Sequence, residues 1–176
     1  MSSNKIHVWD PLVRLLHWTL ATSTTIAFFT HKGPEWLHFL SGYTALAVAI
    51  IRIFVGFTGS HYARFKEFVT GPRTALSYVT DLIKNREKHF IGHNPLGGYM
   101  ILLLLMSVLI SGTAGSLLNT DRLFGDEFVE DIHTFFSYLI VPLVALHICG
   151  VVFTSIRQRE NLVVAMITGE KTNIRS

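Results

Sequence analysis

Charge and cysteine are both scarce in this sequence. Only 15% of its 176 residues are charged, and Cys149 is its one cysteine, which excludes an intrachain disulfide. Internal repeats and low-complexity tracts are also missing, so we expect a single domain over residues 1–176. Hydrophobic residues make up 49% of the chain and its mean hydropathy is +0.41, which exceeds what a soluble domain usually carries. The composition therefore indicates a protein of the lipid bilayer.

Four apolar stretches are long enough to cross a membrane as helices, which takes roughly 18 residues or more. They cover residues 11–29, 38–56, 95–117 and 128–156. Two of them begin at an Asp-Pro or Asn-Pro pair, in which a capping acceptor precedes the residue best tolerated at a first helical position. We predict an all-α, integral membrane four-helix bundle, with the first stretch retained rather than cleaved as a signal peptide.

Glycine and proline punctuate these stretches. Gly56, Gly59 and Gly115 lie near the ends of stretches, where we expect the helices to stop. Pro142 lies inside the fourth stretch, where a proline usually kinks a helix. Any argument that places residues on one face of that helix is therefore approximate across Pro142.

The distribution of Lys and Arg sets an orientation. The N-terminal segment, the 57–94 connection and the tail carry two, six and four of these residues, whereas the other two loops hold only Lys32 and Arg122. The positive-inside rule then places both termini in the cytoplasm. The outer loop between the third and fourth stretches is acidic instead, so a basic partner could dock there. Its acidic residues are Asp121, Asp126, Glu127, Glu130 and Asp131.

Two shorter segments predict amphipathic helices at the membrane surface. In the connection 70–85, Thr70 is the expected cap, Pro72 lies in the first turn, and apolar residues follow at helical spacing. The basic residues of this connection would contact anionic lipid headgroups. A second short helix is expected over 159–166, stopped by Gly169.

Four histidines lie in or at the ends of the apolar stretches, and two of them share the fourth stretch at a separation of fourteen residues. Fourteen residues make close to four helical turns, so both rings leave one face about 21 Å apart along the axis. With the topology above, each falls level with a histidine on a different helix, which is how axial imidazoles hold a planar cofactor inside a bundle. The predicted ligand pairs are His17/His147 toward the cytoplasm and His38/His133 toward the outside.

Arg52 and two glycines fit the same arrangement. Arg52 lies fourteen residues after His38 and so reaches the level of the inner pair, where a haem propionate would neutralise it. Gly42 lies one turn from His38, and Gly150 lies just after His147. Both glycines would leave room for a porphyrin face, and both would equally allow close packing of helices.

Several rival interpretations stay open. Near a membrane end, His38 and His133 are as readily interfacial residues as ligands, whereas His17 and His147 within spans are functional hypotheses by default. A proton or metal channel, or a cofactor-free transport or assembly subunit, would also use buried His and Arg. His93 could meet a propionate, a quinone head group or water. The other histidines are expected to face solvent: His7, His31, His61 and His89.

Other metal chemistries fit less well. Di-iron membrane enzymes need several close histidine pairs with carboxylates, and this sequence has no such groups. Covalent c-type haem attachment needs a Cys-x-x-Cys-His run, which one cysteine excludes. Zinc sites favour tightly spaced ligands with a share of cysteine or carboxylate, which the predicted depths do not offer.

Several short motifs carry a family resemblance. They are Val8-Trp9-Asp10-Pro11 with Arg14 and His17-Trp18; His38 with Gly42 and Arg52; Ala63-Arg64-Phe65 with Gly71-Pro72-Arg73; Gly92-His93-Asn94-Pro95-Leu96-Gly97; and the last stretch with His133, His147, Arg159-Glu160-Asn161 and Met166-Ile167-Thr168-Gly169. On these motifs the sequence resembles, over nearly its full length, the bacterial b-type cytochromes of the cytochrome b561 and nickel-iron hydrogenase cytochrome group.

This resemblance implies a diheme cytochrome b of the bacterial inner membrane, with two haem b groups and ligands in the first, second and fourth spans. Its implied activity is electron transfer between a quinone pool and a redox partner, either a periplasmic cytochrome c or a hydrogenase-like complex. Hydrogenase-bound members usually carry additional sequence, so we expect a cytochrome c partner at least as readily as a hydrogenase.

Overall fold

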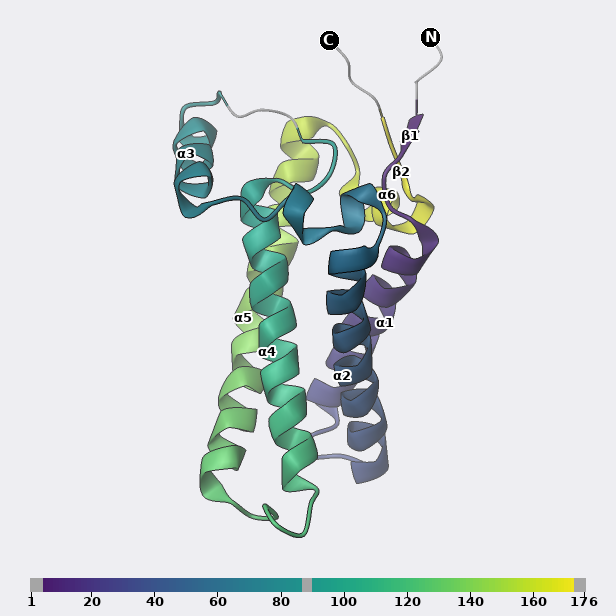
Figure 1. The fold of residues 1–176 in the computed structure, drawn as a ribbon, viewed down its shortest axis with the longest axis vertical. Coiled ribbons are helices and arrows are strands. Elements are labelled where there is room, and N and C mark those ends of the chain that lie inside the picture. Colours follow the sequence, from purple (N-terminus) through teal and green to yellow (C-terminus); the bar gives the residue numbers. More distant parts are fainter. Residues whose placement is uncertain (1–4, 87–89, 173–176) are drawn as a thin grey trace. The chain divides into compact units, whose positions relative to one another are not determined.

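A computed structural model describes residues 5–86 and 90–172, and it is almost entirely helical (Figure 1). The helices are α1 (Pro11–Phe29), α2 (Glu35–Thr58), α3 (Pro72–Ile83), α4 (Pro95–Leu118), α5 (Glu127–Gln158) and α6 (Leu162–Thr168), with 3-10 turns η1 (His61–Ala63) and η2 (Phe65–Glu67). Two short strands, β1 (Lys5–His7) and β2 (Glu170–Thr172), complete the described residues. The all-α class is therefore confirmed, and the structure adds a small antiparallel ribbon that the sequence pattern did not predict.

Three of the described helices, α2, α4 and α5, are long and apolar enough to cross a membrane. The remaining predicted span is α1, which has 19 residues. Four threonines and a serine between residues 19 and 25 make it less apolar than the other three. The span boundaries predicted for these helices fall within three residues of the observed ends.

Side-chain caps fix where the long helices begin. The Asp10 carboxylate accepts a hydrogen bond from the backbone N–H of Val13 at 2.9 Å, and the Asn94 side chain accepts one from Gly97 N–H at 2.7 Å. Both predicted caps are thus confirmed. At α3, by contrast, the predicted cap Thr70 is wrong, because Gly71 occupies the N-cap position and Pro72 the first helical position.

Two predicted glycine exits are wrong, and the kink predicted at Pro142 stays a prediction. Gly56 lies inside α2, which continues to Thr58, whereas Gly59 follows the end of that helix. Gly115 is not a helix exit, because α4 continues to Leu118. Pro142 lies inside α5, and the helix remains continuous from Glu127 to Gln158. Membrane helices tolerate an internal proline when neighbouring groups satisfy the freed carbonyl. Of the histidines expected to face solvent, His7, His31 and His61 are exposed. The fourth, His89, lies outside the described residues.

The chain divides into two compact units, each described here by itself. The helical unit comprises Leu15–Phe54 and Leu102–Ala145, so all four long helices contribute to it. The terminal unit comprises Met1–Arg14, Val55–Ile101 and Leu146–Ser176. The terminal unit therefore brings both chain ends together with α3, α6 and the adjoining ends of the long helices.

In the helical unit, side-chain contacts join α1 to α5 and α2 to α4. The rings of Phe28 on α1 and Tyr138 on α5 meet edge to face with centroids 5.9 Å apart. A Cβ added to Gly112 on α4 would stand 3.1 Å from the Cβ of Leu46 on α2, so this glycine permits close packing. The unit is thus a packed set of four helix segments.

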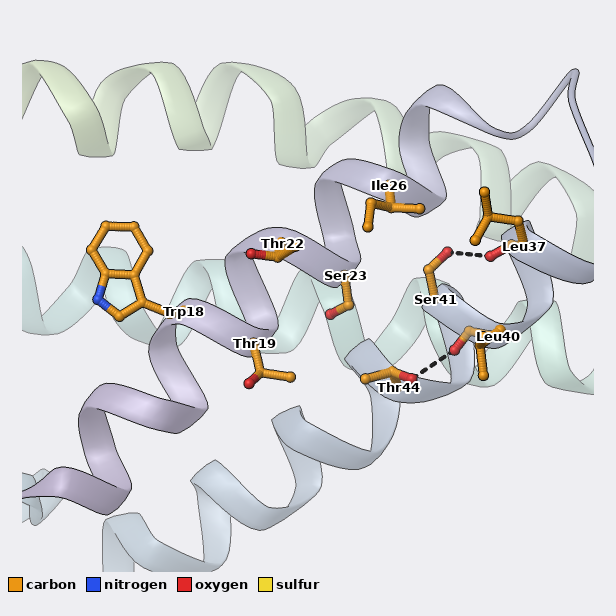
Figure 2. Close-up of a pocket in the computed structure, with 9 residues that line it drawn as sticks. All are labelled: Trp18, Thr19, Thr22, Ser23, Ile26, Leu37, Leu40, Ser41 and Thr44. Carbon is orange, nitrogen blue, oxygen red and sulfur yellow. Dashed lines mark hydrogen bonds between the residues drawn. The ribbon is translucent and has the colours of Figure 1, made fainter. Parts of the chain in front are cut away.

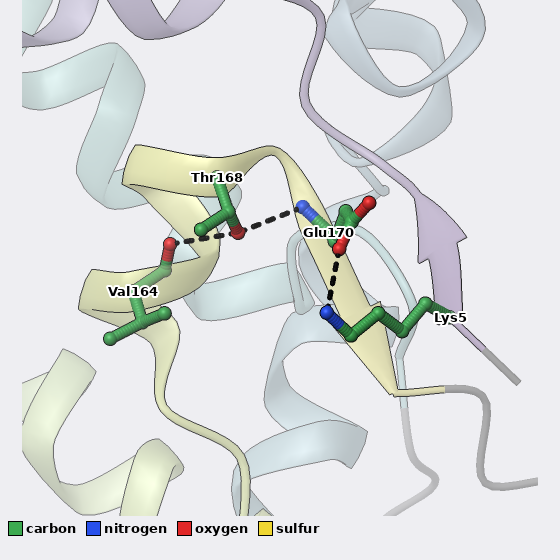
Figure 3. Close-up of polar contacts among 4 residues, drawn as sticks. All are labelled: Lys5, Val164, Thr168 and Glu170. Atoms are coloured by element: carbon green, nitrogen blue, oxygen red, sulfur yellow. Dashed lines mark hydrogen bonds and ion pairs between the residues drawn. The ribbon is translucent and has the colours of Figure 1, made fainter. Parts of the chain in front are cut away.

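In the terminal unit, the two ends of the chain pair with each other. Ile6 of β1 lies opposite Lys171 of β2, and the backbone N–H groups of Val8 and Trp9 both donate to the carbonyl of Gly169. Gly169 has φ +86°, which ends α6 in a conformation that glycine adopts without strain. Figure 3 shows the exposed ion pair between Lys5 and Glu170, 3.0 Å long, on the ribbon.

The two predicted surface helices exist, and the apolar residues of α3 divide between its faces. Tyr78 is buried against the ring of Phe90, whereas Leu76 and Ile83 are 68% and 77% exposed. The second helix, α6, begins after an Asn161 side chain that accepts from Val164 N–H. Their contact with a membrane surface stays a prediction.

Candidate functional site

Within the helical unit, the structure brings His38 and His133 together. His38 lies in the first turn of α2 and His133 in the second turn of α5. Their ring centroids are 6.2 Å apart, and the ring planes are nearly perpendicular, at 83°. Two imidazoles from different helices therefore approach each other, as the level argument from the sequence predicted for this pair.

In both rings, Nδ1 is hydrogen-bonded to a backbone carbonyl of another helix. Nδ1 of His38 lies 2.9 Å from the carbonyl oxygen of Ala27, and Nδ1 of His133 lies 2.9 Å from that of Ser111. Because a carbonyl oxygen can only accept, Nδ1 must carry the proton in both rings. This tautomer presents the lone pair of Nε2, which is the state of a metal-ligating histidine.

The separation of the two rings fits a shared iron. A metal–nitrogen bond measures about 2 Å, and a ring nitrogen lies about 1 Å from its ring centre, so two ligated rings have centroids about 6 Å apart. The observed 6.2 Å agrees with this distance. Perpendicular planes are compatible with ligation, since each ring can rotate about its own metal–nitrogen bond.

One face of α4 supports His133, and the sequence argument missed it. A Cβ at Gly115 would stand 2.9 Å from Cε1 and Nδ1 of His133, so only glycine lets the ring lie this close. Ser111, one turn earlier and 6% exposed, supplies the carbonyl, and its hydroxyl lies 2.7 Å from that of Ser137. A small residue every fourth position in an apolar helix was the available signal.

Open space lies beside His38. A Cβ added to Gly42 meets no heavy atom within 4 Å, and the same holds for Gly150 on the last part of α5. Arg52 on α2 is 7% exposed within the helical unit. A buried guanidinium and an unfilled helix face are both features that a haem with its propionates would use.

A groove between α1 and α2 is a separate feature of the helical unit (Figure 2). It has a volume of about 440 Å³ and includes Trp18, Ser41 and Thr44 in its lining. The hydroxyls of Ser41 and Thr44 donate to carbonyls of their own helix, at 2.6 and 2.7 Å. The groove therefore offers an apolar surface, and because it includes none of the four predicted ligands, we do not assign it as the cofactor site.

The second predicted pair is divided between the two units. His17 lies on α1 in the helical unit, with its ring edge-on to Trp18 at 5.2 Å. His147 lies on α5 in the terminal unit. The pairing of His17 with His147 stays a prediction from helix spacing and topology.

His93 lies in an aromatic environment of the terminal unit. Its ring centroid is 4.5 Å from that of Trp9 and 4.8 Å from that of Phe68. It precedes the Asn94 cap of α4 by one residue. The backbone N–H of Trp9 also donates to the carbonyl of Gly169, so three of the sequence motifs quoted above are linked through Trp9.

This convergence of motifs accompanies a match over most of the chain. A sequence model of the prokaryotic cytochrome b561 family matches residues 8–169. The chain belongs to the prokaryotic cytochrome b561 family. This family consists of four-helix membrane proteins of the b-type cytochrome class, so membership establishes a membrane protein of electron transfer and implies haem b. The resemblance of the motifs is thereby confirmed.

Several relatives of this chain are named as probable Ni/Fe-hydrogenase B-type cytochrome subunits. The protein of Rhizobium leguminosarum bv. viciae is 25% identical over 212 aligned positions, which cover 94% of this chain and 88% of the relative. Those of Cupriavidus necator and Rhodobacter capsulatus are each 24% identical, covering 94% and 95% of this chain and 86% and 81% of the relatives. No solved structure matches the chain.

Proposed function

We propose that this protein is a diheme b-type cytochrome of the bacterial inner membrane, with both termini in the cytoplasm. It would carry electrons between the quinone pool and a redox partner. His38 and His133 would ligate one haem, and His17 and His147 the other. The observation that carries this proposal is the His38–His133 geometry, in which both rings keep Nε2 for a metal at a separation that suits one iron.

The imidazoles would act by filling both axial positions of each iron. Haem b supplies a one-electron redox centre, and bis-histidine ligation leaves it without an open position for oxygen or substrate. The carbonyls of Ala27 and Ser111 would orient the rings and raise the electron density of the ligands, because a hydrogen-bonded Nδ1–H makes Nε2 more basic. A more basic ligand favours the oxidised iron and lowers the potential.

Arg52 would hold a haem propionate. A guanidinium buried in a membrane helix needs a compensating anion, and a propionate carboxylate offers bidentate hydrogen bonds to it. Gly42 would give a porphyrin face access to α2, since no other side chain fills the space beside it.

His93 would serve the quinone side of the reaction. Quinone reduction takes up protons and quinol oxidation releases them, and an imidazole at the start of a membrane helix can give or take a proton in either direction. Trp9 and Phe68 would shield this ring from water on two sides.

Two observations support a choice of redox partner: the names of the relatives, and an acidic surface near the start of α5. Because curated relatives are named as hydrogenase subunits, we propose a hydrogenase-like enzyme first. The acidic surface formed by the loop before α5 and the start of that helix, with exposed Asp121, Glu130 and Asp131, would suit the basic surface of a cytochrome c as the second candidate. Binding of either partner to the purified protein, measured at low and at 0.5 M salt, would separate the two.

Purified protein tests the cofactor directly. We expect b-type bands in a reduced-minus-oxidised spectrum and two haems per chain by extraction. Absence of b-type bands would overturn the proposal in favour of a cofactor-free transport or assembly subunit. One haem per chain would retain the His38–His133 site and reject the second pair.

A further inference from the structure

Lys171 is a lysine held inside the terminal unit. Lys171 is only 5% exposed, although it lies three residues beyond the end of α6 on a two-stranded ribbon. The ammonium donates a hydrogen bond to the carbonyl of Ile91 at 2.9 Å and lies 5.7 Å from the centre of the Trp9 ring. These two contacts link the last strand of the chain to the loop before α4.

Burial of this charge is unfavourable for stability by itself. Loss of hydration lowers the pKa of Lys171, and the nearby carboxylate of Glu160 offsets this only in part. A side chain such as methionine would fill the same space without an ammonium to desolvate. Packing alone therefore does not account for a lysine here.

The contacts of Lys171 lead to His93 by two routes. Ile91, whose carbonyl the ammonium binds, lies two residues before His93. Trp9, whose ring faces the ammonium, also contacts the His93 ring at 4.5 Å. A Cβ added to Gly92 would stand 3.3 Å from the ring of Tyr62, so the loop has little room to shift. Lys171 thus contacts both the loop that carries His93 and the Trp9 ring that packs against it.

We propose that Lys171 is a positioning residue for His93, holding the loop 91–94 and the Trp9 ring so that the imidazole is fixed at the start of α4. The terminal ribbon is then part of the quinone-side site rather than a loose end of the chain. This inference rests on the proposed function, in which His93 exchanges a proton with the quinone. The hydrogen bond sets the position of the loop, and the charge keeps the ring of Trp9 in contact.

Amide hydrogen exchange tests the structural half of this proposal. In the full-length purified protein we expect Lys171→Met to speed exchange in the segment 90–97 by about tenfold, the effect of a local opening made easier by about 1.4 kcal/mol. Lys171→Arg should retain protection, and Lys171→Gln, a neutral donor, should lie between. Lys5→Met is the matched control, because Lys5 belongs to the same ribbon and forms only an exposed ion pair with Glu170. Unchanged exchange in Lys171→Met would overturn the proposal.

A double-mutant cycle tests the functional half. The rate at which a short-chain quinol reduces the purified cytochrome is measured for Lys171→Met, His93→Gln and the double variant. If Lys171 acts through His93, the double variant is no slower than His93→Gln alone, and Lys171→Arg restores the rate. Additive losses would show an independent role and refute the positioning. Haem content is measured in parallel: absence of b-type bands in wild type refutes the proposed function, while the exchange result still decides whether Lys171 holds the loop.

Discussion

The two units hold their histidines by different means. In the helical unit, backbone carbonyls of neighbouring helices accept from Nδ1 of His38 and His133, which leaves Nε2 of each ring for a metal. In the terminal unit, aromatic rings surround His93, and a loop tied to a buried lysine carries it. The first arrangement suits a rigid axial ligand, whereas the second suits a group that exchanges protons.

Removal of a ligand gives the largest expected effect. His133→Ala should lose one of the two haems completely, because a six-coordinate site without one axial imidazole loses a metal bond and its hydrogen-bonded support. Haem extracted per chain and the reduced-minus-oxidised spectrum measure this loss. His31→Ala is the control, since His31 is exposed on the same unit. His147→Ala should remove the other haem, and loss of the same haem in both variants would contradict the pairing.

The contrast between the units also explains what the sequence could predict. Helix spacing and charge distribution place His38 level with His133, because both lie on regular helices whose rise is fixed. The support from Ser111 and Gly115 depends on how α4 packs against α5, which spacing alone does not determine. Lys171 was counted only as a positive charge of the tail, since nothing local signals that the ribbon will bury it. Tertiary contacts thus decided the parts that sequence reasoning missed.

Two glycine substitutions separate packing from cofactor binding in the helical unit. Gly115→Ala should weaken haem retention at the His38–His133 site, because its Cβ would stand 2.9 Å from the His133 ring, and overpacking of this kind costs about 1–3 kcal/mol. Beyond the backbone of its own helix, a Cβ at Gly42 meets no heavy atom of the described residues within 4 Å. Gly42→Ala should therefore affect only the haem-loaded protein, by crowding the porphyrin. Thermal unfolding and haem retention, with and without bound haem, give both comparisons. Equal behaviour of Gly42→Ala and wild type would argue against a porphyrin beside α2.

The buried lysine should make the stability of the terminal unit depend on pH. Burial lowers the pKa of Lys171 from 10.5, so the unfolded chain binds this proton more tightly than the folded chain. Raising the pH through the lowered pKa toward 10.5 therefore stabilises the folded state, by about 1.4 kcal/mol for each unit of lowering. We expect the Tm of wild type to rise relative to that of Lys171→Met between pH 7 and pH 10. Lys5→Met should follow wild type, and a constant difference between wild type and Lys171→Met would contradict the assignment.

Ser111→Ala should give the smallest effect. It tests whether the hydroxyl or the backbone carbonyl of Ser111 positions His133. The short bond of His133 Nδ1, 2.9 Å, goes to the backbone carbonyl, which alanine keeps, whereas the hydroxyl lies 2.7 Å from that of Ser137 and only 3.4 Å from Nδ1. Loss of that hydroxyl removes about 1 kcal/mol of hydrogen bonding and leaves the tautomer unchanged. We therefore expect full haem content and only a small shift in one midpoint potential by redox titration, with Ser137→Ala behaving alike. A loss of haem as large as that of His133→Ala would mean that the hydroxyl, rather than the carbonyl of α4, positions the ligand.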